Sequence, residues 1–347
     1  MSMAYHPSAM GTGTALLHWL DARLAPDAMA WLRERCGELA AGAPDRTLFL
    51  SFSAASRHTG KDELALTAPE LTEANGLREG WNPRSWTADQ AGRIALLLHL
   101  PEDDRARYLT ALDRLFGAAD LGELVALHKA LPLLAFPEAH RTRCAEGVRT
   151  NMTDVLTAVA HENPYPAEQL DEVAWHQVVL KALFVGVKLH PIVGLDRRAT
   201  PELARMLCDY AHERWSANRP VTPELWRCVG PHADDEALAD LERVLRDRGG
   251  HRYLAHQLLK RANLGAVHGV FERDVAQRGR LLYHVELILR RQVLNIDFEH
   301  ETVQLRLGQR VGALQFDRIL RRKHEKWLFQ LVGLALHGDA VLLHRFQ

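Results

Sequence analysis

The residues from Thr87 to Asp104 read TADQAGRIALLLHLPEDD and show how the chain is built. Thr87 can cap a helix that runs through Leu98, because a threonine hydroxyl accepts from the first backbone N–H groups and apolar residues follow at helical spacing. Pro101 and the three acidic residues after it suit the first turn of a second helix. The stretch therefore predicts two helices joined by a short connection.

Similar start signals recur before other runs of helical period, at Asp120, Pro137, Pro166, Pro201, Thr222 and Asp234. Residues 14–40 add a helical hairpin interrupted at Pro26. Connections of a few residues favour antiparallel packing of neighbouring helices. The predicted fold class is mainly α, a stacked antiparallel helical array.

Composition is that of a globular protein: 347 residues, 47% hydrophobic and 25% charged. The longest apolar stretches fall short of the roughly 20 residues that a membrane span needs. The N-terminus lacks the pattern of a secretory signal, and the four cysteines form no CxxC pair. We therefore expect a cytoplasmic protein with reduced thiols.

The C-terminal third differs from the rest in charge and pattern. Residues 251–347 hold 16 basic and 9 acidic residues, against 27 and 35 in residues 1–250. Gly249 and Gly250 mark a domain boundary near residue 250. Apolar residues then alternate with polar ones, which allows two short strands in a β-hairpin; they are Leu294, Ile296, Phe298, Val303, Leu305 and Leu307.

A basic segment of this kind can bind nucleic acid, an anionic membrane surface, or acidic protein. Nucleic acid is disfavoured because the basic residues are not interleaved with aromatic side chains that could stack on bases. We expect residues 251–347 to dock on the acidic remainder of the same chain or on a second subunit, which makes a homo-oligomer an open alternative.

A succession of short blocks between Arg46 and Gly230 resembles the EboA-domain family. The blocks are residues 46–49, 80–83, 130–134, 146–152, 163–166, 175–177, 180–182, 194–196, 209–215 and 223–227 followed by 229–230, with GWNP at 80–83 and NPYP at 163–166. No block is diagnostic alone, but their number and order are. With the boundary near residue 250, we expect residues 1–250 to form an EboA-like helical domain. Residues 251–347, where no resemblance is found, are expected to form a basic helical extension with possible short strands.

The resemblance also implies a biological setting. Such proteins are encoded beside a membrane prenyltransferase, a sugar-phosphate cyclase-like enzyme, a TIM-barrel isomerase-like enzyme and metal-dependent hydrolases. This implies a role in making or exporting a prenylated, cyclitol- or sugar-derived small molecule. It implies no reaction for the chain itself and no cofactor.

Hydrogen-bonding side chains are dense inside otherwise apolar helices between Glu146 and Arg227. Because burying such a group unpaired costs about 1–3 kcal/mol, these side chains must form networks, bind something, or face water. The predicted pocket, which a structural network could equally explain, consists of Arg149, Asn151, Asn163, Tyr165, Trp175, Gln177, Lys181, Asp196, Asp209, His212, Glu213, Arg214 and Arg227. We expect the helices carrying residues 149–151, 175–181 and 209–214 to bring these groups together.

Lys181 is the single residue of most interest, because apolar neighbours surround it in the sequence. An ammonium group in such surroundings must be paired or lose its proton. Lys181 is therefore either a structural ion-pair partner of Asp196 or Asp209, which we favour, or an anion contact or activated amine.

Two metal-site interpretations are weaker than their structural alternatives. His161-Glu162 could join His212-Glu213 in a carboxylate–histidine site. Asp234, Asp235 and Asp240 could bind a metal–diphosphate, although acidic residues commonly open a helix. We predict no metal.

Two functions stay open at this stage. The first is an accessory or ligand-handling protein that acts with the membrane prenyltransferase or another pathway enzyme, in the cytoplasm or peripheral to the inner membrane. The second is an enzyme for a phosphorylated or cyclitol-like intermediate, with Lys181 and arginines as anion contacts and His212 or Glu213 as acid–base groups.

Overall fold

The computed structural model describes residues 9–246, 302–307 and 310–315. The chain divides into two units, residues 1–264 and 265–347, and each is considered by itself. Because their division falls outside the described residues, the boundary near residue 250 stays a prediction. The expected docking of residues 251–347 also lies outside the described part.

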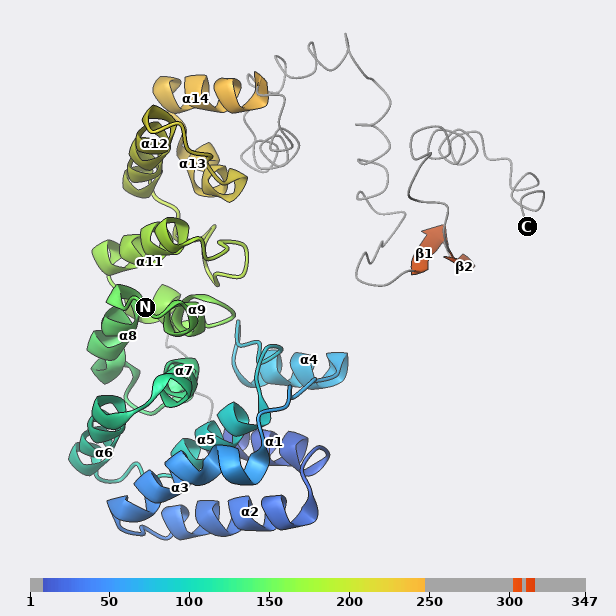
Figure 1. The fold of residues 1–347 in the computed structure, drawn as a ribbon, viewed down its shortest axis with the longest axis vertical. Coiled ribbons are helices and arrows are strands. Elements are labelled where there is room, and N and C mark those ends of the chain that lie inside the picture. The colour runs from blue at the N-terminus through green and yellow to red at the C-terminus, as the bar shows by residue number, and fades with distance from the viewer. Residues whose placement is uncertain (1–8, 247–301, 308–309, 316–347) are drawn as a thin grey trace. The chain divides into compact units, whose positions relative to one another are not determined.

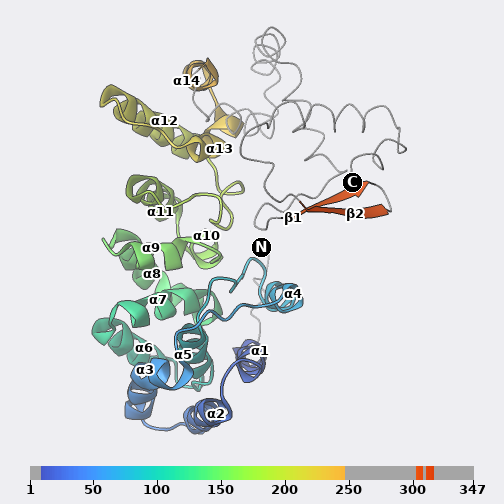
Figure 2. The same ribbon diagram turned by 45° about the vertical axis from the view of Figure 1, so that its right-hand side comes forward.

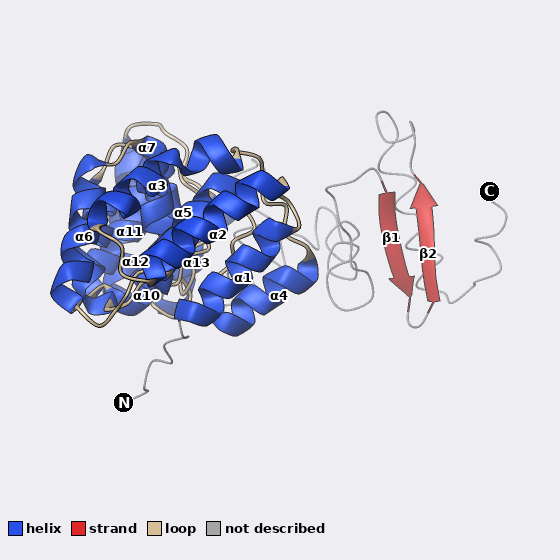
Figure 3. Cartoon of the chain, turned by 90° about the horizontal axis from the view of Figure 1, so that it is seen from below, coloured by secondary structure: helices blue, strands red, loops and turns tan. Residues whose placement is uncertain are grey.

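The first unit is built from α-helices joined by short loops and 3₁₀ turns (Figures 1 and 3). The described helices are α1 Ala9–Asp21, α2 Pro26–Ala40, α3 Asp45–Thr59, α4 Ala68–Leu77, α5 Ala88–Leu98, α6 Arg105–Ala118, α7 Leu121–Ala130, α8 Arg141–Arg149, α9 Thr153–Ala160, α10 Tyr165–Gln169, α11 Glu172–Val185, α12 Pro201–Ser216, α13 Trp226–Val229 and α14 Asp235–Arg246. The prediction of a mainly α fold is confirmed.

Helix α5 lies at the centre of the N-terminal half, and every residue from Ala88 to Leu98 is buried except Gln90. Helices α1, α2, α3 and α7 all pack against it. Thr87 and Gln90 form a capping box at its start, as the sequence indicated for Thr87. Because α5 is buried on almost all sides, these helices form a layer around it, and α5 organises this half.

From α5 onward the helices stack along the chain. Helix α7 packs on α5, α9 on α7, and α11 on α8 and α9, while α12 packs with α13 and α14. Figure 2 shows this order running from α2 at one end to α14 at the other. Asp104, Asp120 and Asp171 each accept a backbone N–H at the start of a helix, so short polar caps place the turns.

The stretch from Arg46 to Trp86 is more helical than its turn-forming residues suggest, because it contains most of α3 and all of α4. Trp81 lies in the GWNP turn and is fully buried, with its ring centroid 5.8 Å from that of Trp19 and 5.6 Å from that of Trp86. The aromatic cluster fixes this turn against the helices.

The second unit contributes one described element, an antiparallel pair of strands, β1 Thr302–Leu307 and β2 Arg310–Gln315. The predicted hairpin within residues 294–307 is not supported. Its second segment overlaps β1, but the partner of β1 follows it in the chain, and residues 294–298 lie outside the described part.

Candidate functional site

The residues predicted to form a pocket do not converge on one site. Arg149, Asn151, Gln177 and Glu213 are exposed, and none of these side chains has a hydrogen bond or ion pair within the described ranges. Solvent can satisfy such groups at no cost, so they needed no common pocket. The expected convergence of the three helices' polar residues is therefore not observed.

Three other predicted residues are buried and serve the fold. Asn163 donates to the carbonyl oxygens of His128 and Ala158, at 3.1 and 3.0 Å. The Tyr165 hydroxyl donates to the carbonyl of Pro137, and burial raises its pKa. The Trp175 indole donates to the Arg198 carbonyl at 3.2 Å. These bonds tie loops to helices, as the structural-network alternative expected.

The charged members of the predicted set pair with other partners. Asp196 binds Arg227 through both carboxylate oxygens, and Asp209 lies 3.3 Å from Arg205. Lys181 is half-buried and has no ion pair among the described residues. The favoured ion pair of Lys181 with Asp196 or Asp209 is therefore wrong. Arg227 binds the carboxylate of Asp196, and Arg205, four residues earlier on the same helix, pairs with that of Asp209.

His212 and Arg214 also have structural partners. His212 Nε2 lies 2.6 Å from Asp240 Oδ2, which joins α12 to α14, and Arg214 donates to the Pro220 carbonyl at 3.1 and 3.0 Å. Asp234 accepts from the Ala237 N–H at the start of α14. Within the described ranges, no three His, Cys, Asp or Glu side chains are placed to hold a metal ion.

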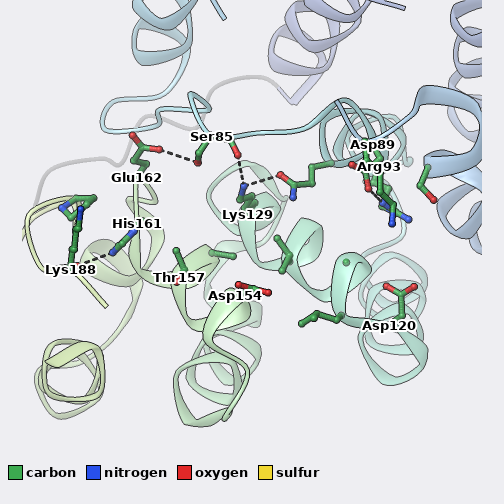
Figure 4. Close-up of a pocket in the computed structure, with 18 of the residues that line it drawn as sticks. Ser85, Asp89, Arg93, Asp120, Lys129, Asp154, Thr157, His161, Glu162 and Lys188 are labelled. Atoms are coloured by element: carbon green, nitrogen blue, oxygen red, sulfur yellow. Dashed lines mark hydrogen bonds and ion pairs between the residues drawn. The ribbon is translucent and has the colours of Figure 1, made fainter. Parts of the chain in front are cut away.

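An open cleft of about 960 Å³ lies elsewhere, beside α5, α7 and α9. Its size is typical of a small-molecule site. Figure 4 shows its polar side chains converging from several elements. The lining residues are Ser56, Lys61, Ser85, Asp89, Gln90, Arg93, Asp120, Leu121, Gly122, Val125, Lys129, Asp154, Thr157, Ala158, His161, Glu162, Lys188, His190 and Pro191.

Helical spacing explains why α7 and α9 each present a row of residues to the cleft. Leu121, Val125 and Lys129 follow one another at intervals of four on α7. Asp154 and Ala158 do the same on α9, and His161 follows directly after that helix. The cleft is therefore a consequence of how these two helices pack.

Lys129 is the central cation of the cleft wall. Its Nζ donates to the Ser85 carbonyl oxygen at 3.1 Å and to Gln90 Oε1 at 2.8 Å (Figure 4). Burial lowers the pKa of Lys129 from 10.5 to about 8, and the charges of Glu162 and Asp89 partly oppose that effect. Both hydrogen-bond acceptors are neutral, so neither supplies a compensating negative charge.

Glu162 supplies a carboxylate on the same wall, and its backbone is held in the left-handed region at φ +52°. Its N–H donates to the Pro191 carbonyl at 3.0 Å, its carbonyl accepts from Asn82, and its carboxylate accepts from the Ser85 hydroxyl at 3.3 Å. A non-glycine residue in this conformation carries strain of about 1–3 kcal/mol, which the surrounding bonds must offset. Glu162 is thus fixed in place.

His161 brings a neutral imidazole to the cleft. Its Nε2 lies 2.8 Å from the Lys188 carbonyl oxygen, which can only accept, so Nε2 carries the proton and Nδ1 is left as an acceptor. Burial lowers the pKa of His161, which favours this neutral form at pH 7. The ring can therefore accept a hydrogen bond or a proton from a bound molecule.

Asp89 and Arg93 close the cleft on the α5 side as a buried ion pair, with only 5% and 3% of the residues exposed. The Thr87 hydroxyl donates to Asp89 at 2.6 Å, and Arg93 Nε donates to the Phe52 carbonyl at 3.0 Å. Each member of the pair thus has a further hydrogen bond to another residue, and the pair forms a fixed floor of the cleft.

A sequence profile described as "Metabolite traffic protein EboA" matches residues 12–230. The chain belongs to the EboA family. This confirms the resemblance drawn from the short blocks, and the family's description gives metabolite traffic as its role. Comparison with curated proteins and with solved structures gives no match.

The whole cleft lies inside the region that matches the EboA family, from Ser56 to Pro191. A smaller hollow of about 490 Å³ adjoins it and shares Glu162, His190 and Pro191 as a common wall. Its other lining residues include Leu71, Val193 and residues 80–82 of the GWNP turn, so its wall combines apolar and polar groups. None of the described helices has the length and apolar content to cross a bilayer.

The apolar sequence surroundings that single out Lys181 are similar around Lys129 of the EboA cleft. Lys129 directly follows His128, but Ala126, Leu127, Ala130 and Leu131 around it are apolar, as are the neighbours of Lys181. His161 and Glu162 were considered as ligands, but together with His212 and Glu213 of α12. The contacts of Lys129 with Ser85 and Gln90 have no signal in the sequence, because 44 and 39 residues separate the partners.

Proposed function

We propose that this EboA-family protein binds a polar, hydroxyl-rich metabolite in the cleft beside α5, α7 and α9 and serves as an accessory traffic protein. The supporting observation is the cleft of about 960 Å³ with Lys129 fixed in its wall. Basic and acidic side chains are balanced there, with Lys61, Lys129 and Lys188 facing Asp120, Asp154 and Glu162. Such a mixture suits hydroxyl groups together with one anionic group.

The ligand in this proposal is an intermediate of a pathway that makes or exports a prenylated cyclitol- or sugar-derived compound. The cleft suits the polar part of such a compound, since few apolar residues line it. The protein would act beside the membrane prenyltransferase or another pathway enzyme, on the cytoplasmic side.

An enzyme of the same pathway is the alternative, and one observation favours it. His161 and Lys129 both have lowered pKa values and both line the cleft, so a neutral base and a partly neutral amine are available. Lys181, His212 and Glu213, which the sequence favours for this chemistry, do not line the cleft.

Binding to the purified full chain tests the proposal. The probes are inositol monophosphate and inositol, measured by calorimetry. We expect the phosphorylated probe to bind, and Lys129→Met to weaken binding tenfold or more, equivalent to about 1.4 kcal/mol. Lys181→Met is the matched control and should bind as the unchanged protein does.

Metabolite profiling of a deletion strain extends this test to the natural ligand. The compound that accumulates should bind the purified protein, and incubation without partners should leave it chemically unchanged. Binding that is insensitive to Lys129→Met, or that is lost equally in Lys181→Met, would contradict the assignment of the cleft. Conversion of the compound would favour the enzyme.

A further inference from the structure

Lys129 differs from the other lysines of the cleft in what surrounds its amine. Lys61 and Lys188 are exposed, whereas Lys129 is half-buried and bonded on two sides. It forms no ion pair within residues 9–246, so no carboxylate compensates a positive charge directly. A lysine placed only to hold a charge would normally have such a partner.

The two hydrogen bonds of Lys129 use two N–H bonds of the amine and leave one tetrahedral position of Nζ without a protein partner among the described residues. A neutral amine has two N–H bonds and one lone pair, whereas an ammonium ion has three N–H bonds. Ser85 O and Gln90 Oε1 accept two of them. The remaining tetrahedral position is occupied by the lone pair when the amine is neutral. Because Lys129 lines the cleft, that position is available to a bound molecule.

The lowered pKa supplies the neutral form under ordinary conditions. With a pKa of about 8, about a tenth of the Lys129 amines are unprotonated at pH 7. At the ordinary value of 10.5 the unprotonated fraction would be roughly two orders of magnitude smaller. A desolvated lysine of this kind is an effective nucleophile toward carbonyl carbon.

We propose that Lys129 captures an aldehyde or ketone metabolite as a reversible imine. The Nζ lone pair forms a bond to the carbonyl carbon, and the π electron pair moves to the carbonyl oxygen. The two amine hydrogens then leave with that oxygen as water, and a C=N bond remains. Because the cleft is open, water can enter and reverse the reaction, so the metabolite is released unchanged.

This inference rests on the proposed function, because the ligand must enter the same cleft, and it narrows the ligand class. Asp154 and Glu162 can accept from hydroxyl groups, and Lys61 or Lys188 can meet an anionic group. The preferred ligand is a hydroxy-aldehyde or hydroxy-ketone that carries a phosphate or carboxylate. An open-chain sugar phosphate fits this description.

Trapping in the full-length protein tests the inference. Pyridoxal 5′-phosphate serves as the aldehyde probe, borohydride reduces any imine to a stable secondary amine, and peptide mass spectrometry locates the label. At pH 7.5 and short times, we expect occupancy at Lys129 at least tenfold above that at Lys181 or Lys188. Occupancy at Lys129 should rise with pH and level off above pH 8.

Lys129→Arg distinguishes imine formation from the effect of positive charge, because arginine keeps the charge but cannot form this imine. We expect it to lose the main label and to keep its thermal stability. Equal labelling of Lys129 and Lys181 in the unchanged protein would overturn the inference without any variant. Inositol monophosphate binding in the same samples distinguishes the two failures. If the probe binds but Lys129 is not trapped, only the imine proposal is overturned. If there is neither binding nor trapping, both proposals are overturned.

Discussion

Similar polar side chains line the cleft beside α5, α7 and α9 and cover the outer faces of α11 and α12. They differ in exposure and in the partners that hold them. On the outer faces, Gln177 and Glu213 are exposed, and Asp209 pairs with a neighbour on its own helix. In the cleft, Lys129 and Glu162 are held by bonds from other elements. Local density of polar residues therefore does not define a site, whereas polar residues fixed by distant elements do.

The largest expected effect concerns the floor of the cleft. Asp89→Ala leaves the Arg93 guanidinium buried and unpaired, which should lower the free energy of unfolding by about 3–5 kcal/mol in urea denaturation. Glu138→Ala removes the partner of Arg105 in an exposed pair and should cost at most about 1 kcal/mol. Similar costs for both variants would show that the cleft floor is no better buried than the outer surface.

Gly147 tests the packing behind the cleft. A Cβ atom there would lie 2.5 Å from His128 Nε2 and 2.7 Å from Val159 Cγ2, so Gly147→Ala must push α8 from α7 and α9. We expect a loss of about 1–3 kcal/mol in the free energy of unfolding. Gly117 in α6 has open space around it, so Gly117→Ala should instead stabilise by about 0.4–1 kcal/mol. Changes of the same sign would refute the close packing.

The pH dependence of stability tests the desolvation of Lys129. Its folded pKa of about 8 lies below the ordinary value, so between pH 8 and 10.5 the unfolded chain binds more protons at this site. Its contribution to the free energy of unfolding should therefore rise with pH in that window, by roughly 1–2 kcal/mol for a half-buried amine. Thermal melts of the unchanged protein and of Lys129→Met, compared at pH 7.5 and 10, measure the difference. A constant difference would mean that the amine is well solvated.

The smallest effect is expected on the outer face of α11. Lys181→Met should change the free energy of unfolding by no more than about 0.5 kcal/mol, because no described group pairs with Lys181. Binding of inositol monophosphate should also be unchanged. A large loss of binding in Lys181→Met would indicate that the ligand binds at the residues predicted from the sequence and not in the cleft.

The sequence predicted the helices well because their signals are local. Thr87 and Asp120 cap the helices that they precede, and proline opens α12. The cleft could not be predicted in the same way. Lys129 meets Ser85 and Gln90 only because α5 and α7 pack side by side, and that pairing of helices is set by the whole apolar pattern. Nothing within a few residues of Lys181 distinguished it from Lys129.

The order in which the helices pack has a consequence for how the molecule opens. Each of α7, α9 and α11 contacts mainly helices that lie one to three places away in chain order, so interfaces between nearby helices carry stability along the stack. Amide hydrogen exchange should then fall into successive groups along the chain, with α5 among the slowest, because its surface is almost wholly covered. The cleft spans several of these interfaces, so a molecule bound across it should slow exchange in α5, α7 and α9 together.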